Sequence, residues 1–137
     1  MYRFTLLVVF VTLLGGSIVQ AASYEKRDGT IVGPILDNFG SPHSYSGNNL
    51  EPFASLANAN LSGAFLLDAF LLDAKLSYAD LSDANLSGAG MGSTNLSYTN
   101  LTGADLTQVI LGDANLDHAN VSGATFTGAE YWINAKW

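Results

Sequence analysis

The side chains that could perform acid-base or metal chemistry in this chain are few and far apart. His43 and His118 lie 75 positions from one another, and the chain contains no cysteine, so the ligand spacing of a zinc site is missing. Serine and threonine are abundant, but they recur where a short hydroxyl side chain favours a turn. A Ser-His-Asp grouping would therefore be coincidental. We predict no catalytic residue and no cofactor-binding site, so the chain is not expected to be an enzyme.

Aspartates are the one group dense enough to suggest a ligand. Four of them fall within sixteen positions and could offer calcium the oxygen atoms that it prefers: Asp68, Asp73, Asp80 and Asp83. Neither an EF-hand loop nor a glycine-rich nonapeptide repeat accompanies them. A solvated acidic rim is therefore the better interpretation, and no metal site is predicted.

Most of these residues belong to a repeat of five residues. It runs without a break from Ala54 to Ile133 and makes sixteen pentads, among them Ala59-Asn60-Leu61-Ser62-Gly63. The third position is Leu in twelve pentads and the first is Ala in thirteen. A fixed short period has to be interpreted before any local propensity.

A period of five fits neither ordinary element. On an α-helix the third positions would scatter around the cylinder, and in a flat strand an odd period would send them to both faces in turn. If the backbone turns sharply after each pentad, all first and third positions point inward and the second and fourth point outward. Four pentads then close one square coil. The sixteen pentads predict an all-β solenoid of about four coils, stacked at about 4.8 Å, whose filled interior has no room for a ligand.

The motif Ala-(Asp/Asn)-Leu-(Ser/Thr)-X resembles the pentapeptide-repeat family. The resemblance covers 80 of the 137 residues. It implies a right-handed quadrilateral β-helix with a tight turn at each corner. It implies little about activity, because the family includes topoisomerase inhibitors that imitate DNA as well as lumenal and secreted proteins.

Residues 1–21 have the pattern of a secretory signal peptide. A basic start at Arg3 precedes an apolar run from Phe4 to Leu14, a glycine pair breaks the run, and small or branched residues lead to Ala21. Cleavage near Ala21 is expected, which predicts an exported protein, whether secreted, periplasmic or lumenal. The alternative is a membrane anchor, but a span needs about twenty apolar residues, and this run is interrupted earlier.

The charge of the chain restricts its partners. Five lysines and arginines stand against twelve acids, for a net charge of −7. Cleavage near Ala21 would remove one cation and no acid, which gives −8. A chain of this sign without a basic patch is not expected to bind nucleic acid or anionic membranes.

The segments on either side of the repeat have a different composition. Residues 22–53 contain the turn signal Asp28-Gly29, and we expect them to cap the open end of the first coil, which a solenoid must cover. Four apolar residues are expected to lie over that coil: Ile31, Val32, Ile35 and Leu36. Residues 134–137 form a C-terminal tail. Either Trp132 and Trp137 fold over the last coil or the chain is a truncated form of a longer one.

One wall of the expected solenoid carries a regular array of amide, carboxylate and hydroxyl groups. Its outward residues are Asn60, Ser62, Asp80, Ser82, Asn100, Thr102, Asn120 and Ser122. Stacked amides often serve only to hydrogen-bond along a solenoid, and the alternative is an ordered lattice that binds ice or carbohydrate. At the adjoining corner, Tyr78, Tyr98 and His118 should stack in successive coils. This column either stabilises the solenoid or stacks against a sugar.

Another wall departs from the repeat because apolar residues occupy its outward positions. We predict an interface made of Phe65, Leu67, Phe70, Leu72, Ile110 and Trp132. Gly90, Gly92 and Gly112 are expected to leave a shallow trough below it. The cover of this patch is either the segment before the repeat or another protein, including a second copy of the chain.

Taken together, these features predict a secreted, non-catalytic, acidic β-solenoid that acts as a structural or protein-binding module. One alternative is a DNA-mimicking inhibitor of a topoisomerase-type enzyme, which the acidity favours and the export signal opposes. The other is binding to ice or carbohydrate through the polar array. Export of the native protein would argue against the first alternative.

Overall fold

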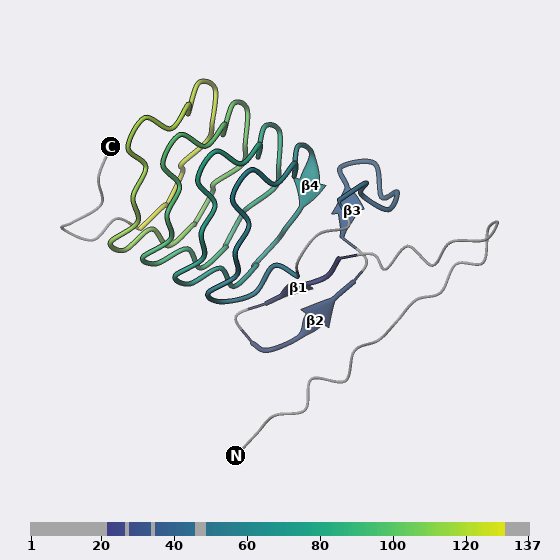
Figure 1. The fold of residues 1–137 in the computed structure, drawn as a ribbon. Helices are drawn as coiled ribbons and strands as arrows, with labels where there is room; N and C mark the ends of the chain where they lie inside the picture. The colour runs from purple at the N-terminus through teal and green to yellow at the C-terminus, as the bar shows by residue number, and fades with distance from the viewer. Residues whose placement is uncertain (1–21, 27, 34, 46–48, 131–137) are drawn as a thin grey trace, which may run out of the picture.

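The computed structural model describes residues 22–26, 28–33, 35–45 and 49–130. In these residues the chain winds into stacked four-sided coils with a small irregular segment at one end (Figure 1). The expected signal peptide, the C-terminal tail and Trp132 lie outside the described residues.

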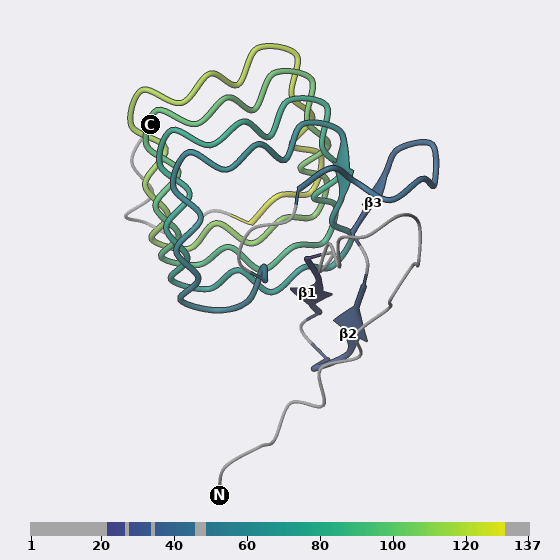
Figure 2. The same cartoon turned by 45° about the vertical axis from the view of Figure 1, so that its right-hand side comes forward.

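Backbone pairing between coils follows the period of twenty residues that four pentads make. Asn60, Asp80, Asn100 and Asn120 form successive parallel bridges. The Leu61 N–H donates to the Asp80 carbonyl at 2.7 Å, and the Asp80 N–H donates back to the Ala59 carbonyl at 2.9 Å. The architecture is the predicted right-handed quadrilateral β-helix, and its four-sided outline is visible in Figure 2. Each wall pairs through so few residues that, over residues 54–130, only one strand lies within the repeat, β4 (Ala64–Phe65).

The corners explain why the chain can turn every five residues. At each one the N–H of a first position donates to the carbonyl of the preceding third position, as from Ala59 to Leu56 at 3.1 Å. The turn encloses the fourth and fifth residues, and φ at the fifth lies between 54° and 72° throughout the described coils. A type II turn requires this positive φ at its third residue. Gly, Asn and Asp adopt the conformation most easily, and they hold ten of the fifteen described fifth positions from residue 58 to residue 128.

The interior is filled as the pattern predicts. Third-position residues from Leu56 to Leu116 are at most 2% exposed, and most first-position alanines are as deeply buried. Thr94 and Thr99 replace alanine inside the core, and their hydroxyls donate to the Leu71 and Leu76 carbonyls at 2.7 and 2.8 Å. The substitutions therefore leave no buried hydroxyl without a partner. Further along, Val121 and Phe126 are only partly buried.

The segment before the repeat pairs with the first coil. Strands β1 (Tyr24–Glu25) and β2 (Ile31–Val32) form an antiparallel hairpin, and β3 (Leu36–Asp37) pairs antiparallel with β4. Beyond β1, Lys26 bridges Ala69, and the Phe70 N–H donates to the Glu25 carbonyl at 2.6 Å. Two walls of the first coil therefore have their outer backbone groups paired.

The buried residues of this segment differ in part from those expected. Ile35 is 1% exposed and Val32 packs against the core, whereas Leu36 is half-buried in β3. Tyr24 at 3% and Leu50 at 0% are buried as well, although neither is among the four residues expected to lie over the coil. They meet because Tyr24 and Leu50 form a parallel bridge. The side chain of Ile31 is not among those described.

Candidate interaction surfaces

Side chains of the polar array form hydrogen bonds with the backbone of the turns in their own coils. In each coil, the side-chain oxygen of the second-position residue accepts a hydrogen bond from the N–H two residues further on. The pairs are Asn60 with Ser62 at 3.2 Å, Asp80 with Ser82 at 3.0 Å, Asn100 with Thr102 at 3.2 Å and Asn120 with Ser122 at 3.1 Å. Asn and Asp are favoured before turns because their side chains make this bond.

Side chains of the array also form hydrogen bonds with one another, both within a coil and between adjacent coils. The Asn100 amide donates to Asp80 Oδ1 at 3.1 Å, and the Ser82 hydroxyl donates to the same oxygen at 2.7 Å. The Ser62 and Ser82 hydroxyls are 2.9 Å apart. Hydrogen bonds from Ser82 and then from Asn100 outweigh partial burial and lower the pKa of Asp80. Acceptor oxygens that a lattice-binding surface would offer outward are thus used within the chain.

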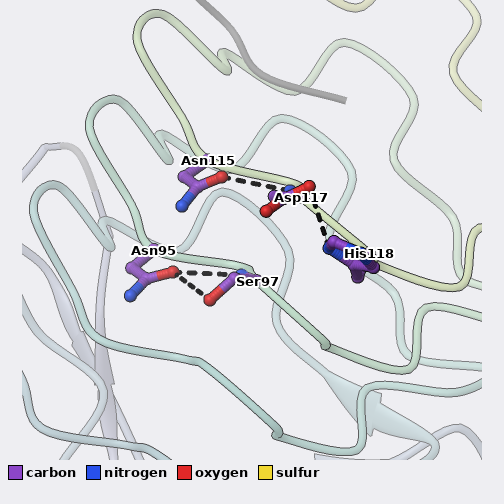
Figure 3. A network of polar contacts seen from close by, with 5 residues as sticks. All are labelled: Asn95, Ser97, Asn115, Asp117 and His118. Atoms are coloured by element: carbon purple, nitrogen blue, oxygen red, sulfur yellow. Dashed lines mark hydrogen bonds and ion pairs between the residues drawn. The ribbon is translucent and has the colours of Figure 1, made fainter.

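The preceding wall repeats the arrangement (Figure 3). Asn95 Oδ1 accepts from the Ser97 N–H at 3.0 Å, and Asn115 Oδ1 accepts from the Asp117 N–H at 3.1 Å. The recurrence of Asn or Asp two residues before Ser or Thr was the sequence signal for these turns.

The aromatic column forms as the repeat predicts. The Tyr78 and Tyr98 ring centroids are 4.8 Å apart with 3° between the planes, and Tyr98 and His118 are 4.7 Å apart with 10° between them. His118 Nδ1 also lies 2.9 Å from Asp117 Oδ1 (Figure 3). Both faces of Tyr98 are covered by its neighbours, so a sugar ring has no face of Tyr98 to stack on.

The predicted apolar interface is partly exposed. Phe65 is 37% exposed, and its four described companions are half-buried: Leu67, Phe70, Leu72 and Ile110. The expected trough is wrong at Gly92, because a Cβ there would lie 3.1 Å from Leu72 Cδ1. The glycine makes room for the Leu72 side chain and leaves no hollow beneath it.

Two further phenylalanines are more exposed than the five described residues of the predicted interface. Phe39 is 94% exposed in the turn after β3, and Phe53 is 71% exposed at the entrance to the first coil. Phe53 also has a φ of 64°. Sequence reasoning missed both, since it placed no weight on isolated aromatic residues outside the outward repeat positions.

Other kinds of site find no support in the described part of the chain. No group of three or more His, Cys, Asp or Glu side chains there could hold a metal ion. The same residues contain no helix with the length and apolar character that crossing a membrane requires.

Comparison with known proteins agrees with the coil geometry. Residues 54–89 and 93–130 match pentapeptide repeats in eight copies. The chain belongs to the pentapeptide-repeat family. Such proteins are generally structural repeat proteins and not enzymes, and no enzyme family is indicated. No curated protein matches the chain in sequence.

Several solved structures are similar to the chain. A pentapeptide repeat protein of the Arabidopsis thaliana thylakoid lumen is 34% identical, with a TM-score of 0.56 over 60% of this chain and 62% of that one. A pentapeptide repeat protein of Nostoc PCC 7120 is 38% identical, with a TM-score of 0.37 over 62% of this chain and 70% of that one. This chain therefore spans about three fifths of the length of the Arabidopsis protein.

Proposed function

We propose that this pentapeptide-repeat protein is an exported, non-catalytic module that binds another protein through the capped end of its solenoid. The observation that carries the proposal is a pair of exposed phenylalanines beside the β3–β4 pairing at that end: Phe39, in the turn after β3, and Phe65, in β4. Large apolar side chains gathered at one end of a small protein are typical of a contact surface. On the polar walls, by contrast, the Asn and Asp side-chain oxygens accept hydrogen bonds from their own turns.

Export is supported by two independent observations. The pattern of residues 1–21 favours a signal peptide. The Arabidopsis protein that is similar over the coils comes from the thylakoid lumen. A lumenal, periplasmic or extracellular location follows for the proposed function.

DNA mimicry receives less support from the coils. Asp80 stands in a column with Asn60, Asn100 and Asn120, and Asp105 stands between Asn85 and Thr125. A phosphate backbone carries a charge at every step, whereas acids in these columns are separated by neutral side chains. The acids at 80 and 105 also accept hydrogen bonds from their own turns.

Fractionation of the source cells and binding measurements test the proposal. The native protein should be found outside the cytoplasm with an N-terminus near Ala22, and the purified protein should form a stoichiometric complex with a partner from the same compartment. A full-length cytoplasmic protein would contradict export. A chain that forms no stoichiometric complex in any compartment would contradict the binding role.

A further inference from the structure

The turn after β3 is built by the carboxylate of its own first residue. Asp37 Oδ1 accepts hydrogen bonds from the N–H groups of Phe39 and Ser41, both at 2.9 Å. The Asp37 backbone adds two more, since its N–H donates to the Ser41 carbonyl at 2.8 Å and its carbonyl accepts from the Gly40 N–H at 3.0 Å. Gly40 supplies the positive φ of 80° that closes the turn. Residues 37–41 therefore form a defined turn.

The same turn is tied to two coils of the solenoid. The Asn38 side-chain amide donates to the Asp83 carbonyl at 2.7 Å, which reaches the second coil. His43 Nε2 donates to the Ser62 carbonyl at 2.8 Å in the first coil. Strand β3 leads into the turn while paired with β4, and the connection stands out from the coils beside β3 (Figure 2). The turn is thus attached to the solenoid by the Asn38 hydrogen bond, and the β3–β4 pairing and His43 attach the residues on either side of it.

The ring of Phe39 has no part in this construction. Its backbone N–H donates to Asp37, which any residue other than proline could do. The side chain itself is 94% exposed, so it gains no packing in the folded chain. A polar residue would satisfy the turn equally well and would be better hydrated. The aromatic ring is therefore unexplained by the fold.

We propose that the turn of residues 37–41 presents Phe39 as a preorganised anchor that enters an apolar pocket on a protein partner. This inference rests on the proposed function of protein binding. Aromatic anchors seated in pockets provide a large share of interface affinity. Because the turn is already fixed, binding loses little conformational entropy in ordering it. Phe39 is thus the specificity element of the capped end.

Charge around the anchor indicates the chemistry of the partner. The charged residue of the turn and the charged residue at its attachment point are both acidic. Asp37 lies within the turn, and the exposed Asp83 lies at its attachment point. An apolar pocket rimmed by lysine or arginine is complementary to this surface, and such complementarity accelerates association at low salt. An anionic membrane would be repelled.

The test uses the full chain carrying a photoreactive phenylalanine analogue at position 39 in the source organism, with position 53 as the comparison. The cross-linked partner is identified and purified, and its affinity is measured by calorimetry for the natural chain, Phe39→Ser and Phe53→Asn. We expect Phe39→Ser to weaken binding about tenfold or more and to leave the melting temperature unchanged. Phe53→Asn, which also removes an exposed ring, should leave the affinity within about twofold. Added salt should weaken the natural complex, and Asp83→Asn should reduce that salt dependence.

Four outcomes would overturn the anchor. If a partner binds Phe39→Ser as tightly as the natural chain, Phe39 is not an anchor, but the protein-binding function still stands. If neither position gives a specific adduct or complex, both the anchor and the protein-binding function are wrong. If Phe39-dependent binding is found for phosphatidylcholine vesicles, the occupant is a lipid surface and not a protein pocket. If the natural chain is a dimer in sedimentation that Phe39→Ser converts to a monomer, the occupant is a second copy.

Discussion

At the scale of single residues, the fifth position of each pentad carries the conformation on which the coil depends. A side chain with a Cβ is strained at positive φ, by roughly 1–2 kcal/mol per residue. Gly63 and Gly88 share a φ of 69°, yet their surroundings differ. Nothing lies within 4 Å of a Cβ placed on Gly63, whereas a Cβ on Gly88 would meet Asp68 Oδ1. Asp68 in turn lies 3.7 Å from Lys26 Nζ.

Comparing alanine substitutions at Gly63 and Gly88 distinguishes the cost of a positive φ from the cost of a steric clash. Gly63→Ala should lower the free energy of unfolding by about 1–2 kcal/mol through φ alone, and Gly88→Ala should lower it further because the Asp68 side chain must move. Urea unfolding of both variants provides the measurement. The Gly88→Ala/Asp68→Ala double variant should recover the excess, and equal effects of the two single glycine variants would contradict the close contact.

Asp80 predicts a dependence of stability on acid. Hydrogen bonds from Ser82 lead the causes that lower its pKa below 3.8. Since the folded value lies below the unfolded one, the carboxylate stabilises the fold above the unfolded pKa, and this contribution is lost as the pH falls through the folded value. Asp80→Asn should remove that part of the slope, which lies on the acid side of the unfolded pKa, in denaturant titrations. An unchanged slope would show that these bonds are not retained in solution.

At the scale of elements, the aromatic column shows how a regular coil spacing generates contacts. Its ring separations of 4.8 and 4.7 Å match the distance between hydrogen-bonded strands. All three residues hold positive φ values between 59° and 61°. Stacking therefore offsets a backbone strain that asparagine or glycine would relieve.

The middle ring should contribute most to the column. Tyr98 takes part in two stacked pairs and Tyr78 in one, and each pair stabilises by about 0.5–1.5 kcal/mol. Tyr98→Ala should therefore lower the free energy of unfolding by about twice as much as Tyr78→Ala in urea titrations. The double variant should lose less than the sum of the single effects because the shared pair is counted once. Strict additivity would contradict a stack in solution.

The elements of the repeat followed from sequence, whereas their contacts with the preceding segment did not. A period of five that places an apolar residue, mostly leucine, at the third position of each pentad requires an inward Leu101, and that residue is 0% exposed. Leu36 pairs with Phe65 and Lys26 with Ala69, but these pairings involve only one or two residues each. Segments that short show no alternation of apolar and polar residues from which the pairing could be predicted. Nor could the exposure of Phe39 be foreseen, since phenylalanine is more often buried.

At the scale of the whole molecule, the solenoid gains its stability from stacking, so an uncovered coil is a weakness. Each coil contacts only its neighbours, and a terminal coil needs a cover on its outer edge. In the described residues, the segment before the repeat lies against the first coil, which is consistent with this role. Ile35 and Leu50 are buried with the coil leucines, and β3 pairs with β4.

Removal of residues 22–48 should therefore expose the first coil. Loss of Ile35 and Tyr24 would uncover Leu56 and its neighbours, and the unpaired backbone groups at Phe65 and Phe70 would be free to pair with another chain. The shortened chain should bind a hydrophobic dye, associate in sedimentation and melt at a lower temperature than the natural chain. The natural chain should neither bind the dye nor associate.

The outward rings of the same coil provide the control for that deletion. If the segment stabilises the coil partly by packing on them, Phe65→Ser and Phe70→Ser in the full chain should lower the melting temperature without inducing association, because the backbone pairing to β3 and Glu25 remains. Phe70→Ser should have the larger effect, since Phe65 is 37% exposed and Phe70 is more buried. A natural chain that is already dimeric and becomes monomeric with Phe70→Ser would assign the surface to a second copy. Substitutions that change neither melting, dye binding nor association would show that the apolar wall is neither a cap site nor an interface.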